Sequence, residues 1–267
     1  MNRPEIRTVL RPSERPTVAM VAYAIAVLAW LALLLHDPVE ASLGSHGHAM
    51  PLDATAPGVA EAVALTDGVG GVVHYLGMWG LMMVAMMYPS TADVFQRFAD
   101  RSSAGHPAGT GSDVVAFVGA YTLLWVLVGL VPLIVAAVVP IAILAAAWGS
   151  LYLGVALLFV GAFQASPVKR RYLGRCRFPS TVLAEGSRPG IASAVRAGWD
   201  FGRLDVGSCG VLMGLMVVVG SMNLVWMLVI TVVLVLERMT AGGYRWARLS
   251  GALAAATGVV LVVAWFV

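Results

Sequence analysis

Long uncharged apolar stretches alternate with short polar segments along the chain. Four such stretches, at residues 17–35, 72–89, 114–139 and 141–163, are each expected to form a helix. A helix rises about 1.5 Å per residue, so segments of this length can cross a hydrocarbon layer about 30 Å thick. The first stretch exceeds the apolar core of a signal peptide, so we expect an uncleaved anchor. Pro89 is expected to end the second helix, and Pro132 and Pro140 to end or kink the third.

A further uncharged stretch, residues 206–236, is too long for one ordinary span and short for two. The turn-prone sequence Gly220-Ser221-Met222-Asn223 lies at its middle, and three arginines follow it. We therefore predict a helical hairpin of residues 205–219 and 222–236, with a single tilted helix as the alternative. With a last span at 251–267, the fold class is an all-α polytopic membrane protein, a bundle of about seven (six to seven) transmembrane helices.

Charge placement predicts the orientation of this bundle. Residues 37–71 contain five acidic and no basic residues, whereas residues 164–204 contain eight basic and two acidic ones. The positive-inside rule then places segment 37–71 outside the cytoplasm and segment 164–204 inside it. We expect residues 1–16 to be a cytoplasmic tail and residues 17–267 to be one domain in a bacterial cytoplasmic membrane. Within the basic loop, residues 190–201 could form an amphipathic helix, either on the membrane surface or packed on the bundle.

Composition narrows the range of functions. The chain is 60% hydrophobic and only 12% charged, whereas soluble domains are about a quarter charged. The net charge of +3 reflects loop arginines, so no nucleic-acid partner is expected; the lipid bilayer is the main partner. The two cysteines, Cys176 and Cys209, do not predict a disulfide framework. The sequence lacks paired intramembrane carboxylates, a His-x-x-x-His pair and a Ser–His pair at credible spacing, so we do not expect an enzyme.

Methionine is concentrated in one helix. Five of the ten residues from Met78 to Met87 are methionine, against 13 in all 267 residues. His74, Met78, Met82 and Met86 recur every fourth residue and share one helical stripe. A thioether is a soft, uncharged ligand that suits Cu(I) within a membrane. Methionine is equally a flexible apolar filler between helices, and the stripe alone favours that simpler reading.

A second group of sulfur atoms lies in the predicted hairpin. Cys209, Met213 and Met216 are at helical spacing, and Cys209 could supply a thiolate. Together with the first stripe they form the predicted metal-ligand set: Met78, Met82, Met83, Met86, Cys209, Met213, Met216 and His74. His46, His48 and Met50 could gather the ion outside, and Cys176 could be a terminal ligand or an inert thiol. Asn223 and Glu237 need partners, and for Glu237 we expect Arg238 or an arginine of the basic loop.

Four sequence blocks follow one another between residues 72 and 250. They are Met78-Trp79-x-x-Met82-Met83-x-Ala85-Met86-Met87-x-Pro89; Gln164-x-x-Pro167-x-Lys169 through Cys176-Arg177-x-Pro179; Gly207-Ser208-Cys209-Gly210-Val211-Leu212-Met213; and Gly220-x-Met222-Asn223-x-x-Trp226-Met227 with Glu237. These blocks resemble those of a bacterial family of integral membrane proteins of unknown function, described as predicted metal-binding. The family's third block has adjacent cysteines, where this chain has Ser208-Cys209, so a site with two thiolates is not carried over.

Two functions remain open. The first is an inner-membrane metal-binding protein that handles or translocates a soft ion such as Cu(I) through methionine and cysteine ligands. The sequence lacks a nucleotide-binding motif, so any movement of the ion would be passive or driven by a gradient. The second is a structural or assembly subunit, in which methionines only pack helices and the basic loop docks a membrane or periplasmic partner.

Overall fold

The computed structural model describes residues 17–43, 56–105, 110–186 and 190–267, and within these ranges it contains helices and no strand. The helices are α1 Thr17–Leu43, α2 Val59–Thr66, α3 Gly68–Gly105, α4 Thr110–Val128, α5 Leu130–Val138, α6 Ile141–Ala165, α7 Pro167–Arg177, α8 Ser180–Gly186, α9 Ile191–Val219, α10 Leu224–Met239 and α11 Gly243–Phe266. Six helical segments in the described ranges are long and apolar enough to span a membrane. The all-α polytopic fold is therefore confirmed. The expected tail at residues 1–16 lies outside the described residues.

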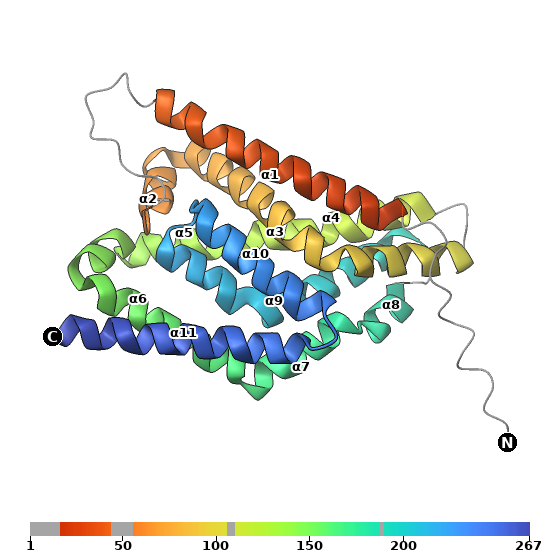
Figure 1. The fold of residues 1–267 in the computed structure, drawn as a ribbon. Helices are drawn as coiled ribbons and strands as arrows, with labels where there is room; N and C mark the ends of the chain where they lie inside the picture. The colour runs from red at the N-terminus through yellow and green to blue at the C-terminus, as the bar shows by residue number, and fades with distance from the viewer. Residues whose placement is uncertain (1–16, 44–55, 106–109, 187–189) are drawn as a thin grey trace.

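The long helices run back and forth along one axis (Figure 1). Helices α7 and α8 lie at one end of the bundle, which we call the basic end, and α2 and α5 lie at the other. Helix α10 has 16 residues, about 24 Å, and is shorter than the six candidate spans. It nevertheless returns the chain from the α9–α10 turn to the basic end, so α1 begins and α11 ends at opposite ends of the bundle.

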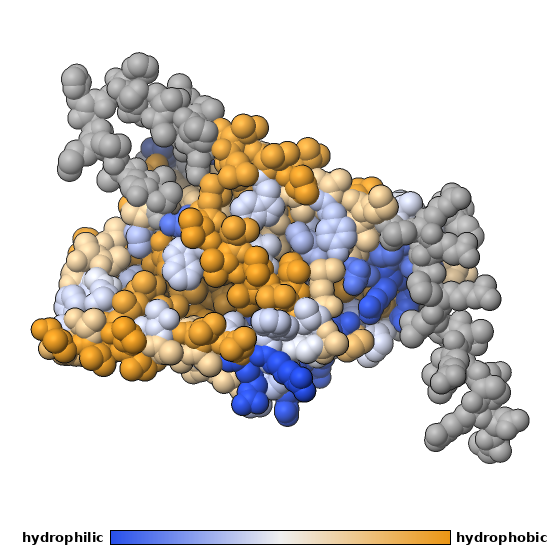
Figure 2. Space-filling model, in the orientation of Figure 1, coloured by the Kyte–Doolittle hydropathy of each residue, from blue (hydrophilic) through white to orange (hydrophobic). Residues whose placement is uncertain are grey.

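The flanks of the bundle expose large apolar side chains. Met20, Leu28 and Leu35 of α1 are 64%, 65% and 68% exposed, and Phe159 of α6 and Val260 of α11 are exposed to a similar degree. Hydrophobic side chains cover much of the visible flank, and the larger hydrophilic patches gather toward the basic end (Figure 2). A continuous apolar flank of this size is what a surface facing lipid requires.

The prediction that Pro89 ends the second span is wrong, because α3 continues through Pro89 to Gly105. A proline in a helix lacks the N–H that would bond the carbonyl four residues earlier. Here that carbonyl belongs to Ala85, and it accepts a hydrogen bond from the indole Nε1 of Trp30 on α1 at 3.1 Å. A side chain of a neighbouring helix thus satisfies the oxygen that Pro89 leaves without its usual donor.

The predicted hairpin turn is confirmed: α9 ends at Val219 and α10 begins at Leu224. Asn223 caps α10, because its side chain accepts from the backbone N–H groups of Val225 and Trp226. The amphipathic helix that residues 190–201 could form is the first part of α9, which is continuous from Ile191 to Val219. Ala194, Ala197 and Phe201 are buried, so this part packs on the bundle, which is one of the two predicted alternatives.

Helices α6 and α11 pack through paired glycines. A Cβ atom on Gly154 would lie 3.0 Å from the carbonyl oxygen of Gly258, and one on Gly161 would lie 2.7 Å from that of Gly251. Both pairs are seven residues apart on their helices, so they repeat every two turns along an antiparallel contact. Small residues at such a seam let two membrane helices approach closely.

Candidate functional site

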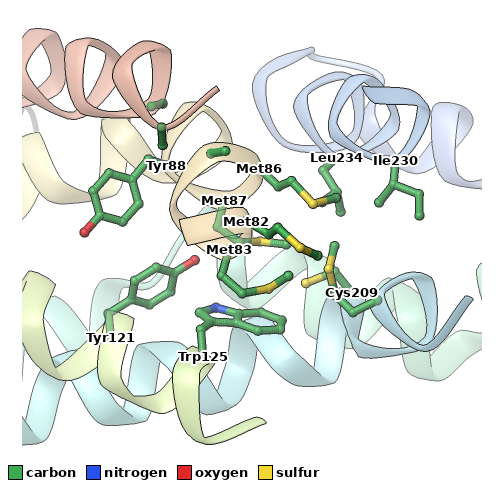
Figure 3. Packing of buried hydrophobic residues seen from close by; sticks show 14 of the residues in the cluster. Met82, Met83, Met86, Met87, Tyr88, Tyr121, Trp125, Cys209, Ile230 and Leu234 are labelled. Atoms are coloured by element: carbon green, nitrogen blue, oxygen red, sulfur yellow. The ribbon is translucent and has the colours of Figure 1, made fainter. Parts of the chain in front are cut away.

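The methionines of α3 lie in the core of the bundle. Met82, Met83, Met86 and Met87 are each at most 1% exposed. Cys209, Met213 and Met216 of α9 and Met227 of α10 are buried in the same hydrophobic cluster. Met82, Met83 and Met86 extend from α3 toward the side of the cluster where Cys209 lies (Figure 3). The structure therefore brings together most of the predicted ligand set, which we call the sulfur core: Met82, Met83, Met86, Cys209, Met213 and Met216.

His74 and Met78 lie outside the sulfur core. His74 is exposed, with its ring centroid 6.1 Å from that of His36 on α1, and Met78 is partly buried. Each step of four residues along α3 advances about 6 Å, so the stripe passes from an exposed histidine through Met78 to buried Met82. His46, His48 and Met50 lie outside the described residues.

Asp205 of α9 is the polar centre beside the sulfur core. Its side chain is fully buried, and its Oδ2 accepts from the hydroxyl of Tyr121 at 2.5 Å and from the indole of Trp125 at 3.3 Å. Its Oδ1 forms an ion pair with the guanidinium of Arg238 on α10. A buried carboxylate is stable only with such partners, and here they come from α4 and α10.

Cys209 follows Asp205 by one helical turn. Its thiol donates to the backbone oxygen of Asp205 at 3.1 Å, and the sulfur lies 3.7 Å from the carboxylate Oδ1. Arg238 Nη2 lies 3.6 Å from the same sulfur. A guanidinium beside a cysteine favours its thiolate, which is the form that binds a metal. Here the sulfur is a thiol that donates a hydrogen bond, and Arg238 is the nearby cation that would face it once its proton is lost.

A second buried network fastens α7 to the hairpin. Lys169 Nζ lies 2.5 Å from Glu237 Oε2 and donates to the backbone oxygen of Ser208 at 2.8 Å. Gln164 also donates to Glu237 at 2.6 Å. The expected partner of Glu237, an arginine, is therefore wrong: Arg177 reaches only the backbone oxygen of Glu237, and Arg238 turns to Asp205. Adjacent residues of a helix point about 100° apart, so the side chains of Glu237 and Arg238 are directed to different neighbouring helices and do not pair with each other.

A small cavity of about 40 Å³, which we call the basic-end cavity, adjoins Arg238. It is lined by Ser90, Thr91, Asp93, Val94, Arg97, Cys176, Arg177, Phe201, Arg238 and Met239. Cys176 of α7 is buried there, and burial raises the pKa of its thiol, while the charges of Arg238 and Lys169 partly oppose that rise. The second cysteine is thus a buried thiol that lines the same cavity as Arg238.

Sequence reasoning missed the charged residues of this site. The sequence predicts no buried contact for Asp205 or Lys169 and indicates Arg238 as one of the candidate partners of Glu237, yet all three side chains are at most 5% exposed. Asp205, the carboxylate immediately before the uncharged stretch 206–236, was the available signal, because a charge next to a span needs a partner. Among the described residues, no group of three histidine, cysteine or acidic side chains is placed to hold a metal ion. A metal site here would therefore depend on thioethers.

Comparison with known proteins gives one match. The model of the family PpoB2, described as a copper chaperone, matches residues 76–261, from the methionine-rich part of α3 into α11. No curated protein and no solved structure matches the chain. The matched range contains the whole sulfur core, the Asp205–Arg238 pair and the basic-end cavity, but not His74 or residues 46–50.

Proposed function

Because this chain belongs to the PpoB2 family of copper chaperones, we propose that it binds Cu(I) in the sulfur core and passes it to a copper-requiring membrane or periplasmic partner. The observation that carries the proposal is the burial of the α3 methionines and Cys209 in one cluster. Family membership supports a copper-related function, and the sulfur core supplies the soft ligands that Cu(I) prefers.

The proposed ligands are Cys209 as thiolate, with thioethers drawn from Met82, Met83, Met86, Met213 and Met216. Thioethers carry no charge, so they can surround an ion in a membrane without adding buried charge. Cu(I) and one thiolate together are neutral, so the bound ion would not need a further anion. Loss of the thiol proton accompanies metal binding, and Arg238 at 3.6 Å stabilises the sulfur while it is anionic.

The stripe on α3 suggests how copper reaches this site. His74 is exposed, Met78 is partly buried and Met82 is fully buried, so soft ligands follow one another from the surface to the core. We propose that His74 receives the ion from the predicted extracytoplasmic side, where His46, His48 and Met50 are expected to gather it. In this proposal the chain lies in the bacterial inner membrane with its amino terminus in the cytoplasm.

A structural role remains the second candidate, and one observation favours it. Met82, Met83, Met86 and Met87 are as fully buried as ordinary core residues, which is what packing alone would produce. In that case the chain would be an assembly subunit, and replacement of these methionines by leucine would preserve its function.

Metal content separates the two candidates. The full chain, purified in detergent after growth with copper, is compared by mass spectrometry with the variant Met78→Leu, Met82→Leu, Met86→Leu, Cys209→Ser. Met20→Leu is the matched control, because Met20 is 64% exposed on α1 and far from the sulfur core in the chain. We expect near-stoichiometric copper in the wild type and the control, and its loss from the folded quadruple variant. Equal copper in all three proteins would contradict the proposed site.

A further inference from the structure

The basic-end cavity reaches from the surface to the edge of the sulfur core. Its lining includes exposed Asp93, Arg97 and Met239 as well as buried Cys176 and Phe201. Arg238 also lines this cavity, and its Nη2 lies 3.6 Å from the sulfur of Cys209. One guanidinium therefore contacts both a cavity that is lined by a thiol and the proposed copper ligand.

Arg238 has a donor that the protein leaves open. Its side chain is 5% exposed, and its Nη atoms contact Asp205, Ser90 and Cys209. Its Nε is buried and has no hydrogen-bond acceptor among the described residues. A buried N–H without an acceptor is unfavourable, so this donor would gain from an acceptor that a ligand supplies.

The charges of the lining point to an anion. Three arginines, Arg97, Arg177 and Arg238, face one carboxylate, Asp93. Asp205 offsets Arg238, and Arg177 donates to the backbone oxygens of Glu237 and Thr240. The lining therefore keeps a net positive charge that can attract an anion, and Arg97 is its exposed cation. Two sulfur atoms, the thiol of Cys176 and the thioether of Met239, add soft ligands to the same lining.

We propose that the basic-end cavity is the site at which the chain exchanges Cu(I) with an anionic thiolate complex, with Cys176 as the incoming or outgoing ligand. A Cu(I) ion held by two thiolates is a complex with one negative charge. Its soft metal matches the sulfur atoms of the lining, and its negative charge matches the arginines. The inference rests on the proposed function, because it concerns how the sulfur core is loaded or emptied.

The exchange balances without any redox partner. In the loading direction, one Cu–S bond to a carrier thiolate breaks and a Cu–S bond to the Cys176 sulfur forms. The proton of the Cys176 thiol leaves on the displaced carrier thiolate, which departs as a neutral thiol. Copper stays Cu(I), and the complex on Cys176 keeps one negative charge, which Arg97 and Arg238 face.

The size of the cavity limits what can enter it. A volume of 40 Å³ corresponds to about three water molecules at 10–15 Å³ each. A metal ion and one sulfur atom fit this space, whereas the body of a carrier does not. The carrier must therefore stay at the mouth, beside exposed Arg97 and Asp93, and present its thiolate inward.

The test measures copper uptake by the full chain from two donors, bis-glutathione Cu(I), which is anionic, and tetrakis-acetonitrile Cu(I), which is cationic. Copper retained after rapid desalting gives the rate. Cys176→Ser and Cys176→Ala remove the thiol, Arg97→Gln removes a charge at the mouth, and Arg175→Gln is the matched control, an exposed arginine on α7 outside the cavity lining.

We expect both Cys176 variants to load from the glutathione complex on the order of ten-fold more slowly, because the thiol that receives the copper is missing, but to reach wild-type copper from the acetonitrile complex. Arg97→Gln should slow only the anionic donor, and Arg175→Gln neither. Because Arg97 is exposed, this variant keeps the test decisive even if the Cys176 variants misfold. Unchanged uptake from glutathione in the folded variants would overturn the exchange site alone. No copper in the wild type from either donor would overturn the proposed function and, with it, the exchange.

Discussion

Arg238 and Asp205 form an ion pair whose side chains are 5% and 0% exposed, and it joins α10 to α9 one turn before Cys209. Removing one member of such a pair leaves an uncompensated buried charge, which is destabilising by about 3–5 kcal/mol. We expect Asp205→Asn and Arg238→Gln each to destabilise the chain strongly. The double variant should lose less free energy of unfolding than the two single variants lose together. Denaturant unfolding in detergent measures the stability of all three variants. Additive losses would mean that the two groups do not depend on each other.

Lys169 should be as important to folding as any residue of the core, although it lies on α7, a helix rich in positive charge. It contacts Glu237 and the backbone oxygen of Ser208, and its side chain is 0% exposed. We expect Lys169→Met to destabilise the chain by about 3–5 kcal/mol, because Glu237 would keep its charge without a cation.

The control for Lys169→Met is Arg175→Met, six residues later and exposed on α7. An exposed substitution of this kind usually changes stability by less than about 0.5 kcal/mol. Melting temperatures of the two variants in the same detergent provide the comparison. A similar decrease in melting temperature in both variants would show that stability depends on the overall charge of α7 and not on the Lys169–Glu237 contact.

The hydrogen bond from Trp30 to Ala85 can be tested through Pro89. In Trp30→Phe the oxygen of Ala85 loses its donor, and we expect a loss of about 1–3 kcal/mol. In Pro89→Ala the backbone N–H of residue 89 returns and can bond the same oxygen. The double variant should therefore be less impaired than Trp30→Phe, as measured by unfolding. If Pro89→Ala gives Trp30→Phe no relief, the indole acts by packing and not as the substitute donor.

The glycine seam between α6 and α11 predicts a sharp position dependence. Gly161→Leu would drive a side chain into the backbone of Gly251, so we expect separation of the two helices and loss of monodisperse protein. Gly77→Leu on α3 is the control, because no atom of the described structure lies within 4 Å of a Cβ there. Size-exclusion chromatography in detergent compares the two variants. If both elute as monodisperse protein, the paired glycines are not needed for α6 and α11 to pack.

The sequence was sufficient for those features that depend on local pattern. Uninterrupted apolar stretches predicted the helices, and the spacing of Cys209, Met213 and Met216 predicted a shared buried face, which the structure confirms. The turn-prone sequence Gly220-Ser221-Met222-Asn223 marked the hairpin turn, and the structure adds that Asn223 caps α10 there.

The features that escaped prediction depend on partners far away in the chain. Pro89 normally ends a helix, and only Trp30, 55 residues before Ala85, shows why it does not here. Asp205 and Arg238 are 33 residues apart by number, and no local pattern relates them. The same holds for Glu237, where the nearest basic residue in sequence suggested a partner that the direction of its side chain excludes.

The two neighbouring charges at the end of α10 also fix how this helix can move. Glu237 is held toward α7 and Arg238 toward α9, so the helix is gripped on two sides at one level. A slip of one residue would translate α10 by about 1.5 Å and turn it by about 100°, which would break both ion pairs together. Screw-like sliding of α10 is therefore blocked. If copper exchange requires the bundle to open, a helix other than α10 must move, and α3 contacts α10 at this level through Ser90 and Arg238.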